Sequence, residues 1–568
     1  MFSTLTALIL YTAPFADIQN GIAKAAPSIE LPAAGSSFHH LDDLHSQQMK
    51  TQKEITAIIQ NGKTLEKRGD LSGALKCYKD GYRKYPTSTA IQRNFSRMKV
   101  LCDIRKRYSS QMHLELILKM DAERFHLFVD DFLTTFGNFY HPLSPAEIFK
   151  RELLCINIAL HSRDFCSRIL PEYSEEEIQR FYQAASALGK SRTLQTHDEL
   201  VSANLELGTL FEQHFRKKGC ILVSEGLFSF IASLDTYSEV LLPVQHKEQI
   251  AEIQGELVGI GIEISVSGGK TYIQRLLPDS PAAQAGIRRG ELITKIDGIS
   301  TLSKSQVQVS EMLCGTEGTP VRLTLDDQNG RTYSVELFRR HVTYPSISCS
   351  RLIPDSTDTA KIGYVHLERF QDNTPDEVET FLRTFMPQGM DRMIIDLRGN
   401  PGGTVTSAVN TADLFLQDGV ILKTQSRSHT QFQYHADARK YYTLPLAILI
   451  DEESASAAEI FAAALQDHQR GILIGKQSFG KWVIQSLLPI PNTPFHMKLT
   501  TSRFYSPLEH QYNHVGIEPD LVIHQTGKPI FNEEMDSQGN FSNAQSQMLR
   551  QIQDPVLLRA AELLSQTE

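Results

Sequence analysis

The sequence predicts an α+β protein of several domains, in which an all-helical N-terminal region precedes a small β-rich module and an α/β core. The chain has 568 residues, enough for roughly three or four domains of ordinary size. Its first half shows helical periodicity, and from about Glu256 onward short strands and helices alternate. Hydrophobic residues make up 41% and charged residues 22% of the chain, a globular composition that excludes wholesale disorder and a coiled coil.

The chain as a whole is acidic. It holds 57 Lys and Arg residues against 66 Asp and Glu residues, a formal charge of −9. No overall positive field therefore exists to attract nucleic acid or anionic lipid, and we expect no nucleic-acid partner. A local basic patch stays open and has to be argued from individual residues. The seven cysteines include no CxxC pair, which excludes a zinc ribbon and argues against a disulfide-dense scaffold.

The start of the chain is typical of a secretory signal. An apolar run from Leu5 to Ala13 precedes Ala-Pro-Phe-Ala, which fits an h-region with a small-residue cleavage site. No basic residue comes before the run, so a soluble N-terminal helix or a misassigned start is the alternative. No later stretch reaches the ~18 to 20 uncharged apolar residues of a membrane span. We therefore expect an exported, periplasmic protein that lies near a membrane at most, without a spanning helix.

Residues 46–215 are predicted to be helical throughout. Between Thr51 and Asp103 we expect two helices, separated by a turn at Gly69-Asp70 and ended by Pro86. This pattern resembles one tetratricopeptide unit, although an ordinary helical hairpin explains it equally well. A single unit cannot bury its own face, so it should pack on later helices. Such helical flanks are compatible with a homodimer. Further helices are expected over 125–133, 148–160 and 175–188.

Residues 251–342 are predicted to form a compact β-rich module. Its Gly-rich start at Leu257 resembles the carboxylate-binding loop of PDZ domains, where successive backbone N–H groups converge on a peptide C-terminus. A dinucleotide loop does not fit, because Ile264 stands where a third glycine is needed. The stretch from Asp279 to Gly298, with Ser-Pro-Ala-Ala-Gln-Ala-Gly, resembles the signature of bacterial PDZ domains. A β module without a ligand is the alternative. The expected peptide-binding residues are Val258, Gly259, Ile260, Gly261 and Ile262.

After His341 the pattern is that of an α/β core with a buried sheet. Near-continuous apolar strands are expected over 361–367, 393–397 and 446–450, each followed by a helical pattern. A polar stretch over 527–545 then leads to an amphipathic helix. That helix begins at Asp554-Pro555, a cap followed by proline at the first helical position.

Three stretches of this core carry side chains suited to catalysis. Asp396-Leu-Arg-Gly-Asn-Pro-Gly-Gly is a glycine-rich turn that follows a buried strand, and alone it fits any tight turn. Ser454-Ala-Ser456-Ala-Ala-Glu opens an Ala-rich helix, where backbone donors favour a developing negative charge. A serine in this position is more often only a helix cap.

The third stretch ends in Phe-Gly-Lys481-Trp482-Val483-Ile-Gln485. If it is a strand, Lys481, Val483 and Gln485 share one face. A lysine partly buried beside an apolar strand has a lowered pKa, and its neutral amine can act as a general base. An isolated lysine is otherwise a solvated charge.

In this order and spacing, the three stretches resemble the C-terminal processing (tail-specific) serine protease family. Leu499-Thr-Thr-Ser-Arg-Phe-Tyr-Ser-Pro and Val515-Gly-Ile-Glu-Pro-Asp also fit that family, and the PDZ module lies where the family inserts it. Ser233-Leu-Asp-Thr-Tyr-Ser resembles the family's L-D-P-H-S just before that module. The resemblance covers about residues 225–525. It implies a leader and linker (1–45), a helical domain (46–215), a protease segment (216–250), a PDZ domain (251–342), a protease core (343–525) and a tail with a terminal helix (526–568).

The resemblance also implies the role of each site residue. Ser456 would be the nucleophile, Lys481 the general base, and Gln485 the residue that orients the lysine amine. The oxyanion donors would be the Ala457 N–H and a glycine N–H at Gly402 or Gly403. Such a peptidase needs no metal and no diffusible cofactor, and its partners are polypeptides with accessible C-termini.

The chain departs from the family pattern at two places, and two other interpretations stay open. Trp482 replaces the usual glycine after the lysine, and Thr236-Tyr237 replaces Pro-His. A Ser-His-Glu peptidase of the same superfamily is one alternative, but His468 is the only histidine near the nucleophile helix. A non-catalytic PDZ adaptor on a degenerate protease fold is the other.

Overall fold

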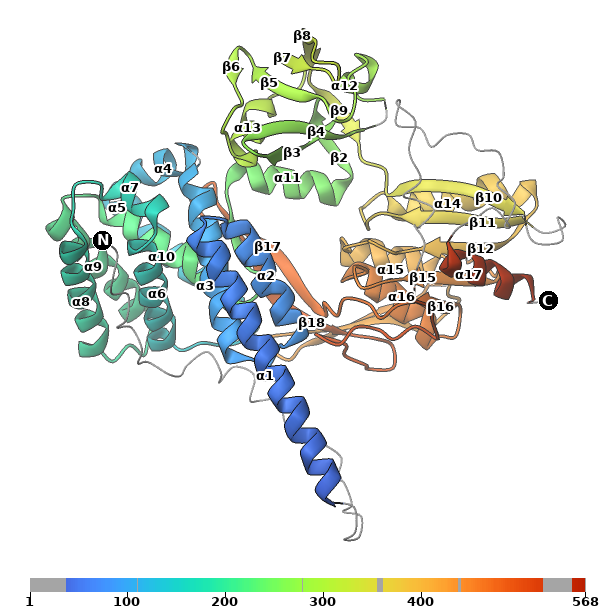
Figure 1. Cartoon of the computed structure of the whole chain (residues 1–568), viewed down its shortest axis with the longest axis horizontal. Coiled ribbons are helices and arrows are strands. Elements are labelled where there is room, and N and C mark those ends of the chain that lie inside the picture. The colour runs from blue at the N-terminus through green and yellow to red at the C-terminus, as the bar shows by residue number, and fades with distance from the viewer. Residues whose placement is uncertain are drawn as a thin grey trace. The chain divides into compact units, whose positions relative to one another are not determined.

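The computed structural model describes residues 37–109, 111–277, 279–354, 361–437, 441–524 and 554–566 (Figure 1). The predicted signal and the polar stretch 527–545 lie outside these residues. The chain forms two compact units, which are described separately. The first takes in the chain up to Tyr108, Ile148–Arg192 and Thr209–Thr236, and the second takes in the rest.

The first unit begins with a helical hairpin and a third helix: α1 (Ser37–Lys67), α2 (Leu71–Lys84) and α3 (Thr89–Ser109). The predicted turn is present, and the Asp70 side chain caps α2 by accepting the Gly73 N–H at 2.8 Å. Ala74 and Tyr78 of α2 are buried together with Phe95 and Met98 of α3. Helix α1 starts at Ser37, within the stretch that the sequence suggested as a linker, because side chains of low hydropathy do not by themselves prevent helix formation.

The remaining helices are divided between the two units: those within residues 109–147 and the first part of the helix over 197–215 belong to the second unit. Their bounds are α4 (Gln111–Leu118), α5 (Ala122–Phe136), α6 (Pro145–Leu160), α7 (Arg163–Ile169), α8 (Glu175–Ser191), α9 (His197–Phe215) and α10 (Gly219–Leu234). Helix α10 is the centre of the first unit, since its residues from Gly219 to Ser233 are all buried. The one carboxylate of α10, Glu225, is paired inside the unit with Arg107 at 2.5 Å. Breaking such a pair leaves an uncompensated buried charge, so it ties α3 to α10.

In the second unit, the PDZ module is a sheet with the strand order β3-β4-β5-β7-β8, and a two-stranded ribbon of β2 and β9 lies beside it. Its elements are β2 (Glu256–Gly259), β3 (Ile262–Ser267), β4 (Lys270–Leu276), α12 (Pro281–Gln284), β5 (Leu292–Ile296), β6 (Ile299–Ser300), α13 (Gln306–Leu313), β7 (Pro320–Asp326), β8 (Thr332–Phe338) and β9 (Arg340–Thr343). Strand β3 is an edge strand, and α13 lies against it. An edge strand leaves one row of backbone groups to which an extended segment can add as a further strand.

The α/β core is a six-stranded sheet with the order β10-β11-β12-β15-β16-β19. All neighbours pair in parallel except β10 and β11. The bounds are β10 (Ile347–Pro354), β11 (Lys361–Leu367), β12 (Met390–Asp396), β15 (Leu446–Ile450), β16 (Ile472–Gly475) and β19 (Leu521–Val522). The three strands predicted here as continuous apolar runs are the central ones, β11, β12 and β15.

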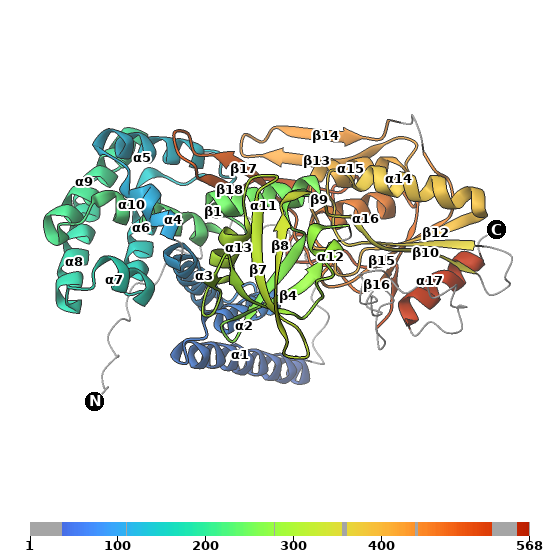
Figure 2. The ribbon, with the colours of Figure 1, turned by 90° about the horizontal axis from the view of Figure 1, so that it is seen from above.

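Helices cover both faces of this sheet (Figure 2). One face packs on α14 (Thr374–Phe385), α15 (Val405–Asp413) and α16 (Ala457–Asp467), and the other packs on α17 (Pro555–Ser565). A short 3₁₀ turn (Met386–Gln388) follows α14. Successive side chains of one strand point to opposite faces of the sheet. Ile395 packs with α14, α15 and α16, and Ile394 packs with α17. Both faces are therefore dry, as a parallel sheet requires.

A second sheet of this unit joins segments that are distant in the chain. Its order is β1-β18-β13-β14, and β17 also pairs with β18. The strands are β1 (Glu239–Leu241), β13 (Val420–Ser426), β14 (Gln431–His435), β17 (Val483–Pro489) and β18 (His496–Tyr505). Helix α11 (Pro243–Gln254) connects β1 to the PDZ module. No described helix combines the length and hydropathy that a bilayer span requires.

Candidate active site

Ser456 lies at the junction between β15 and α16, with a backbone that few residues other than glycine adopt. Its φ is 57° and its ψ is −113°. Such strain persists only where the surroundings enforce it. The neighbouring residues are held on both sides, because the Ala455 N–H donates to the Asn400 carbonyl and the Phe479 N–H donates to the Ser454 carbonyl, each at 2.9 Å. The strained turn presents the hydroxyl of a half-buried serine at the start of a helix.

Ser454, the other serine of the motif, is a structural residue here. Its buried hydroxyl donates to the Leu397 carbonyl at 2.7 Å and accepts the Asp451 N–H at 2.9 Å. A buried hydroxyl that is engaged in this way is not accessible to a substrate. Ser456 is therefore the better candidate for a nucleophile.

Glu459 is the buried centre of the site. One carboxylate oxygen, Oε2, accepts the backbone N–H of Ser456 and of Lys481, each at 2.8 Å. The other, Oε1, accepts the Ser478 hydroxyl at 2.6 Å and the Gly480 N–H at 2.7 Å. Four donors on one carboxylate fix the segment of Lys481 against the turn of Ser456.

The pKa of Glu459 is shifted by its surroundings. Burial raises the pKa of this carboxyl above its usual range, and the hydrogen bonds from Ser478 and from the three backbone N–H groups oppose that shift only in part. A protonated carboxyl keeps one donor of its own and accepts fewer hydrogen bonds. The four hydrogen bonds to Glu459 thus require its ionised carboxylate, although burial disfavours that form.

The start of α16 and the glycine-rich turn meet beside Ser456. The Ala457 N–H opens α16 and donates no hydrogen bond to the described residues. Gly402 lies against the same turn, since a Cβ built on it would be 2.8 Å from Ser456 Cβ and 2.9 Å from Ala457 N. The φ of Gly402 is 103°, so only glycine fits there. The close approach brings the glycine-rich turn to the helix end that favours anions.

Of the two glycines in that turn, Gly402 already uses its N–H. The group donates to Asn400 Oδ1 at 2.8 Å. The Gly403 N–H has no acceptor among the described residues. Phe370 holds the turn from the other side, because its N–H donates to the Gly402 carbonyl and its carbonyl accepts the Thr404 N–H. Gly403 is therefore the better second donor for an oxyanion.

A buried ion cluster lies next to the glycine-rich turn and includes Arg398, a residue of that turn. Arg398 Nη2 lies 2.6 Å from Asp396 Oδ2 and 2.7 Å from Asp554 Oδ2, and all three side chains are at most 1% exposed. Tyr364 donates its hydroxyl to Asp396 at 2.8 Å. Burial alone would raise the pKa of Asp396, but the Arg398 guanidinium outweighs burial and holds that pKa below its usual range. Asp554 also accepts the first N–H groups of α17, so the terminal helix is anchored to the glycine-rich turn.

Lys481 extends its amine over an aromatic ring. Its Nζ lies 4.7 Å from the centroid of Tyr237, one of the two residues that replace Pro-His. The face of a tyrosine ring attracts an ammonium group. Tyr237 lies two residues before β1, which leads through α11 to the PDZ module. The contact therefore joins the lysine to the start of that connection.

The strand predicted around Lys481 differs in the structure. Strand β17 starts only at Val483, and a bulge lies between Ile484 and Gln485, so the expected alternation of one shared face does not hold. The Gln485 amide donates to Thr500 Oγ1 at 3.3 Å and to the Val483 carbonyl at 3.4 Å. Trp482 is fully buried and stacks on Phe504 with ring centroids 4.6 Å apart. The buried tryptophan takes the chain out of strand geometry before β17 begins.

The predicted peptide-binding residues of the PDZ module fall at the turn from β2 to β3. Gly261 has a φ of 72°, and a Cβ there would lie 2.1 Å from Ser280 Cβ, so glycine is required. The N–H groups of Ile260 and Gly261 donate to no residue in the described parts of the chain. Ile260 is buried and Ile262 starts the edge strand. Free N–H groups beside a strand edge suit an extended peptide that ends in a carboxylate.

An ion pair connects the PDZ module to the core within the second unit. Arg275 of β4 donates Nη1 to both Glu368 oxygens, at 2.7 and 2.8 Å. Glu368 is two residues from Phe370, which holds Gly402. A continuous chain of contacts thus runs from the module to the glycine-rich turn.

Histidines take other positions. His468 is at the far end of α16 from Ser456, and its Nε2 lies 2.8 Å from the Val420 carbonyl. His366 contacts Ser348 and the Arg398 carbonyl. These engaged rings give no support to a Ser-His arrangement.

Sequence reasoning quoted Glu459 and Asp554 in motifs but gave neither a role in the site. The spacing Ser456-x-x-Glu459 is a capping-box signal, and it could have indicated that the carboxylate reaches back to the Ser456 N–H. The contacts of Glu459 with Gly480 and Lys481 depend on a loop about 20 residues away and have no local signal.

Known protein families match the α/β core and the PDZ module. Residues 361–523 match the model of peptidase family S41, and residues 272–326 match a PDZ domain model. A carboxyl-terminal-processing protease of Picosynechococcus sp. is 34% identical over 310 residues, which cover 54% of this chain and 74% of that protein. One of Synechocystis sp. is 31% identical over 299 residues, or 52% and 69%. Among solved structures, the photosystem II D1 C-terminal processing protease aligns with 23% identity and a TM-score of 0.38, over 62% of this chain and 94% of that one.

Proposed function

The chain belongs to the carboxyl-terminal-processing serine proteases of peptidase family S41, and on this premise we propose that it cleaves polypeptides with a Ser456–Lys481 pair. The observation that carries the proposal is the carboxylate of Glu459, which binds the backbone of both residues with one oxygen. A nucleophile and a base must keep a fixed separation, and a shared buried acceptor provides it.

In the proposed reaction, the Ser456 hydroxyl attacks the scissile carbonyl carbon while the neutral Lys481 amine takes its proton. The negative charge that develops on the carbonyl oxygen is stabilised by the N–H groups of Ala457 and Gly403. Lys481 then gives the proton to the leaving amine, and an acyl-enzyme remains on Ser456. Water then attacks the acyl carbon while the same amine takes its proton; the bond to Ser456 Oγ breaks, the amine returns that proton to Oγ, and the new C-terminus leaves.

Gln485 keeps a positioning role in this proposal, although its contacts are indirect. Its amide is bonded to Thr500, which also lies 3.5 Å from the Ser238 hydroxyl. Ser238 follows Tyr237, the residue under the Lys481 amine. Gln485 thus supports the segment against which the lysine rests.

Substrates are proposed to enter through the PDZ module. An unstructured, apolar C-terminus would pair with the edge of β3 and place its carboxylate at the N–H groups of Ile260 and Gly261. The Arg275–Glu368 ion pair links that event to the turn that contains Gly402 and Gly403. We also propose export of the chain, on the apolar run Leu5–Ala13. N-terminal sequencing of the protein isolated from its host tests that point.

The decisive experiment compares Ser456→Ala and Lys481→Ala with the wild type on casein and with a fluorophosphonate probe. Both variants are expected to lose cleavage by more than about 1,000-fold, and Ser456→Ala is expected to lose labelling. Ser454→Ala is the matched control and keeps labelling at residue 456. Cleavage at the wild-type rate by Lys481→Ala would refute the proposed base. A substrate with and without its apolar C-terminal tail tests the role of the PDZ module.

A further inference from the structure

The helices before residue 108 carry a charge opposite to that of the rest of the chain. Residues 50–107 contain 15 Lys and Arg residues against 5 Asp and Glu residues, a net charge of +10. The remaining chain has 42 basic and 61 acidic residues, a net charge of −19. This segment lies outside the residues that match the peptidase and PDZ models. Its charge therefore has no explanation in the proposed catalysis.

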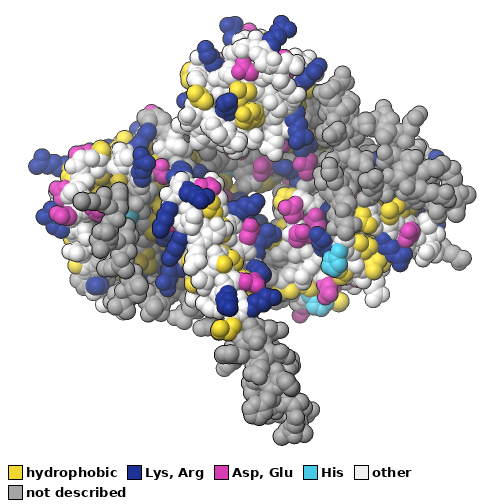
Figure 3. Space-filling model, in the orientation of Figure 1, with side chains coloured by type: hydrophobic (Ala, Val, Ile, Leu, Met, Phe, Trp, Pro, Cys, Tyr) yellow, Lys and Arg dark blue, Asp and Glu magenta, His cyan; other side chains and the backbone are white. Residues whose placement is uncertain are grey.

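Most of these basic side chains are exposed. Twelve of the fifteen face solvent, whereas Asp70 and Asp80 are the only exposed acidic side chains of the segment. The buried Arg107 is neutralised by Glu225. Among the exposed cations, Lys84, Arg105 and Lys106 form ion pairs with Glu54, Asp164 and Asp103, and the exposed basic side chains still far outnumber the exposed acidic ones. The exposed set is Lys50, Lys53, Lys63, Lys67, Arg68, Lys76, Lys79, Arg83, Lys84, Arg93, Lys106 and Arg105. In the space-filling view, Lys and Arg predominate over α1, α2 and α3 (Figure 3).

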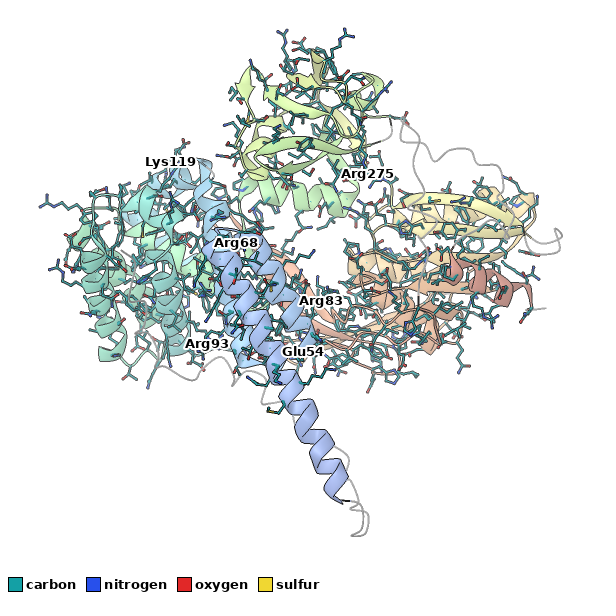
Figure 4. The ribbon with its side chains drawn as sticks, viewed as in Figure 1. Glu54, Arg68, Arg83, Arg93, Lys119 and Arg275 are labelled. Carbon is teal, nitrogen blue, oxygen red and sulfur yellow. The ribbon has the colours of Figure 1, made fainter. Side chains whose placement is uncertain are left out.

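The helical periodicity places these charges on outward stripes. On α2, Lys76, Lys79 and Arg83 are spaced i, i+3 and i+7, and the buried Ala74 and Tyr78 lie on the other side of the helix. On α1, the exposed Lys63 and Lys67 are one turn apart and lie on one side of the helix, away from the buried Gly62. Arg68 directly after α1, Arg83 on α2 and Arg93 on α3 show how widely the charge is spread (Figure 4).

The chemistry of this surface distinguishes between possible anionic partners. No aromatic side chain of residues 50–107 is exposed, so no platform exists on which bases could stack. Eight of the twelve exposed cations are lysines, which are point charges rather than the planar forks that read phosphates or carboxylates in defined geometry. A broad set of lysines on outward helix faces suits a surface of many exchangeable anionic groups.

From these observations we propose that α1, α2 and α3 form a basic surface, defined by the twelve exposed residues above, that binds the anionic phospholipid headgroups of a membrane. The enzyme is thereby held beside a bilayer. The anionic membrane repels the rest of the chain, which has a net charge of −19.

The interaction has a defined strength and salt dependence. Each Lys or Arg near an anionic bilayer contributes a factor of about five to the binding constant. Removing three of these charges is therefore expected to weaken binding by about 100-fold. Screening acts over about 10 Å at an ionic strength of 0.1 M, so binding must weaken as salt is added.

The test is co-sedimentation of the full chain with vesicles of phosphatidylcholine that contain about one-third phosphatidylglycerol. The variant is Lys67→Glu, Lys76→Glu and Lys79→Glu, none of which is part of the proposed catalytic site. The matched control is Lys150→Glu, Arg180→Glu and Lys190→Glu, which makes the same change in net charge on α6 and α8. Cleavage of casein and the circular dichroism of each variant report whether the fold is intact.

We expect the wild type and the control to bind these vesicles and to dissociate from them at about 0.5 M salt. The surface variant is expected to bind at least 100-fold more weakly while it cleaves casein at the wild-type rate. Equal binding by the two variants, or no binding by the wild type, would overturn the proposal. Tighter binding to single-stranded DNA or to polyglutamate than to vesicles would overturn the assignment to membranes. Casein cleavage at the wild-type rate separates this outcome from failure of the proposed catalytic pair.

Discussion

The carboxylate of Glu459 and the backbone of Lys481 are joined by a hydrogen bond of 2.8 Å across 22 positions of the chain. The same oxygen accepts the N–H of Ser456, so a single buried group sets the distance between the two proposed catalytic segments. A misplacement of about 1 Å is enough to slow a reaction by about 100-fold. The stability of this one contact is therefore a condition for activity.

Glu459→Gln is expected to lower kcat/KM by about 100-fold. The amide has one acceptor oxygen, and its NH2 group faces N–H donors that the carboxylate had satisfied. Rates on an unstructured peptide measure the effect. Glu453→Gln, an exposed neighbour, serves as control and should keep the wild-type rate. Wild-type activity in Glu459→Gln would contradict a positioning role.

The raised pKa of Glu459 predicts loss of activity on mild acidification. Because the folded-state pKa lies above the ordinary value, folding is favoured, not weakened, as the pH falls through it. Activity falls in the same range, since the protonated carboxyl holds fewer donors. An activity–pH profile and an unfolding–pH profile should thus separate above about pH 4.3. If both fall together there, Glu459 is not the group responsible.

For Asp396 we expect the opposite dependence of stability on pH. Its folded-state pKa is lowered, so its stabilising contribution is complete above the ordinary value near pH 3.9 and is lost as the pH falls below it. Denaturant titrations of the wild type should show a falling free energy of unfolding in that range. Asp396→Asn should show a weaker dependence on pH there. An unchanged slope in the variant would contradict this assignment.

Gly402→Ala is expected to abolish activity. A Cβ at this position would lie 2.7 Å from the Ala455 carbonyl oxygen and 2.8 Å from Ser456 Cβ, so the turn must move away from the nucleophile. Gly399→Ala is the matched control, because its φ is also positive but no atom lies within 4 Å of the added Cβ. The control should lose about 1 to 2 kcal/mol of stability and keep activity. A fluorophosphonate should label Ser456 in Gly399→Ala but not in Gly402→Ala.

Asp554→Asn is expected to destabilise the protein by about 3 kcal/mol, because it removes one of two carboxylates that neutralise a buried arginine. Asparagine still caps α17, so the loss reports the charge and not the cap. Thermal unfolding measures it. Asp376→Asn, in the first turn of α14, is the control and should change stability by less than about 0.5 kcal/mol. A similar small change in Asp554→Asn would refute the role of the ion cluster.

Arg275→Gln is expected to reduce the preference for substrates with an apolar C-terminal tail, while cleavage of tailless substrates stays unchanged. The variant breaks the contact with Glu368 that connects the PDZ module to the glycine-rich turn. Arg322→Gln breaks an exposed ion pair inside the module and is the control. An unchanged preference in Arg275→Gln would exclude this route of coupling.

The elements of the fold could largely be predicted because their signals are local. Apolar runs gave the central strands β11, β12 and β15, and Asp554-Pro555 marked the start of α17. The late start of β17 had no such signal, since it results from burial of Trp482 between Phe504 and Tyr512, which are distant in sequence. Side chains that meet only after folding set that boundary.

The candidate site shows the same division. The spacing of Ser456 and Lys481 was visible in the sequence, and so was the glycine-rich turn. The sequence could not show whether Gly402 or Gly403 is the second oxyanion donor. That choice depends on Asn400, whose side chain accepts the Gly402 N–H and not the Gly403 N–H. The basic surface of α1 to α3 was hidden in the overall charge of −9, which averages segments of opposite sign.

The ion cluster places Asp554 in the same buried network as the turn beside Ser456, more than 150 positions apart in the chain. During synthesis, a ribosome makes the serine and the lysine long before it reaches this aspartate. Until then the guanidinium of Arg398 has one of its two counter-charges missing. The charge of Arg398 is thus fully compensated only when α17 docks, so the support of the glycine-rich turn is completed late in synthesis.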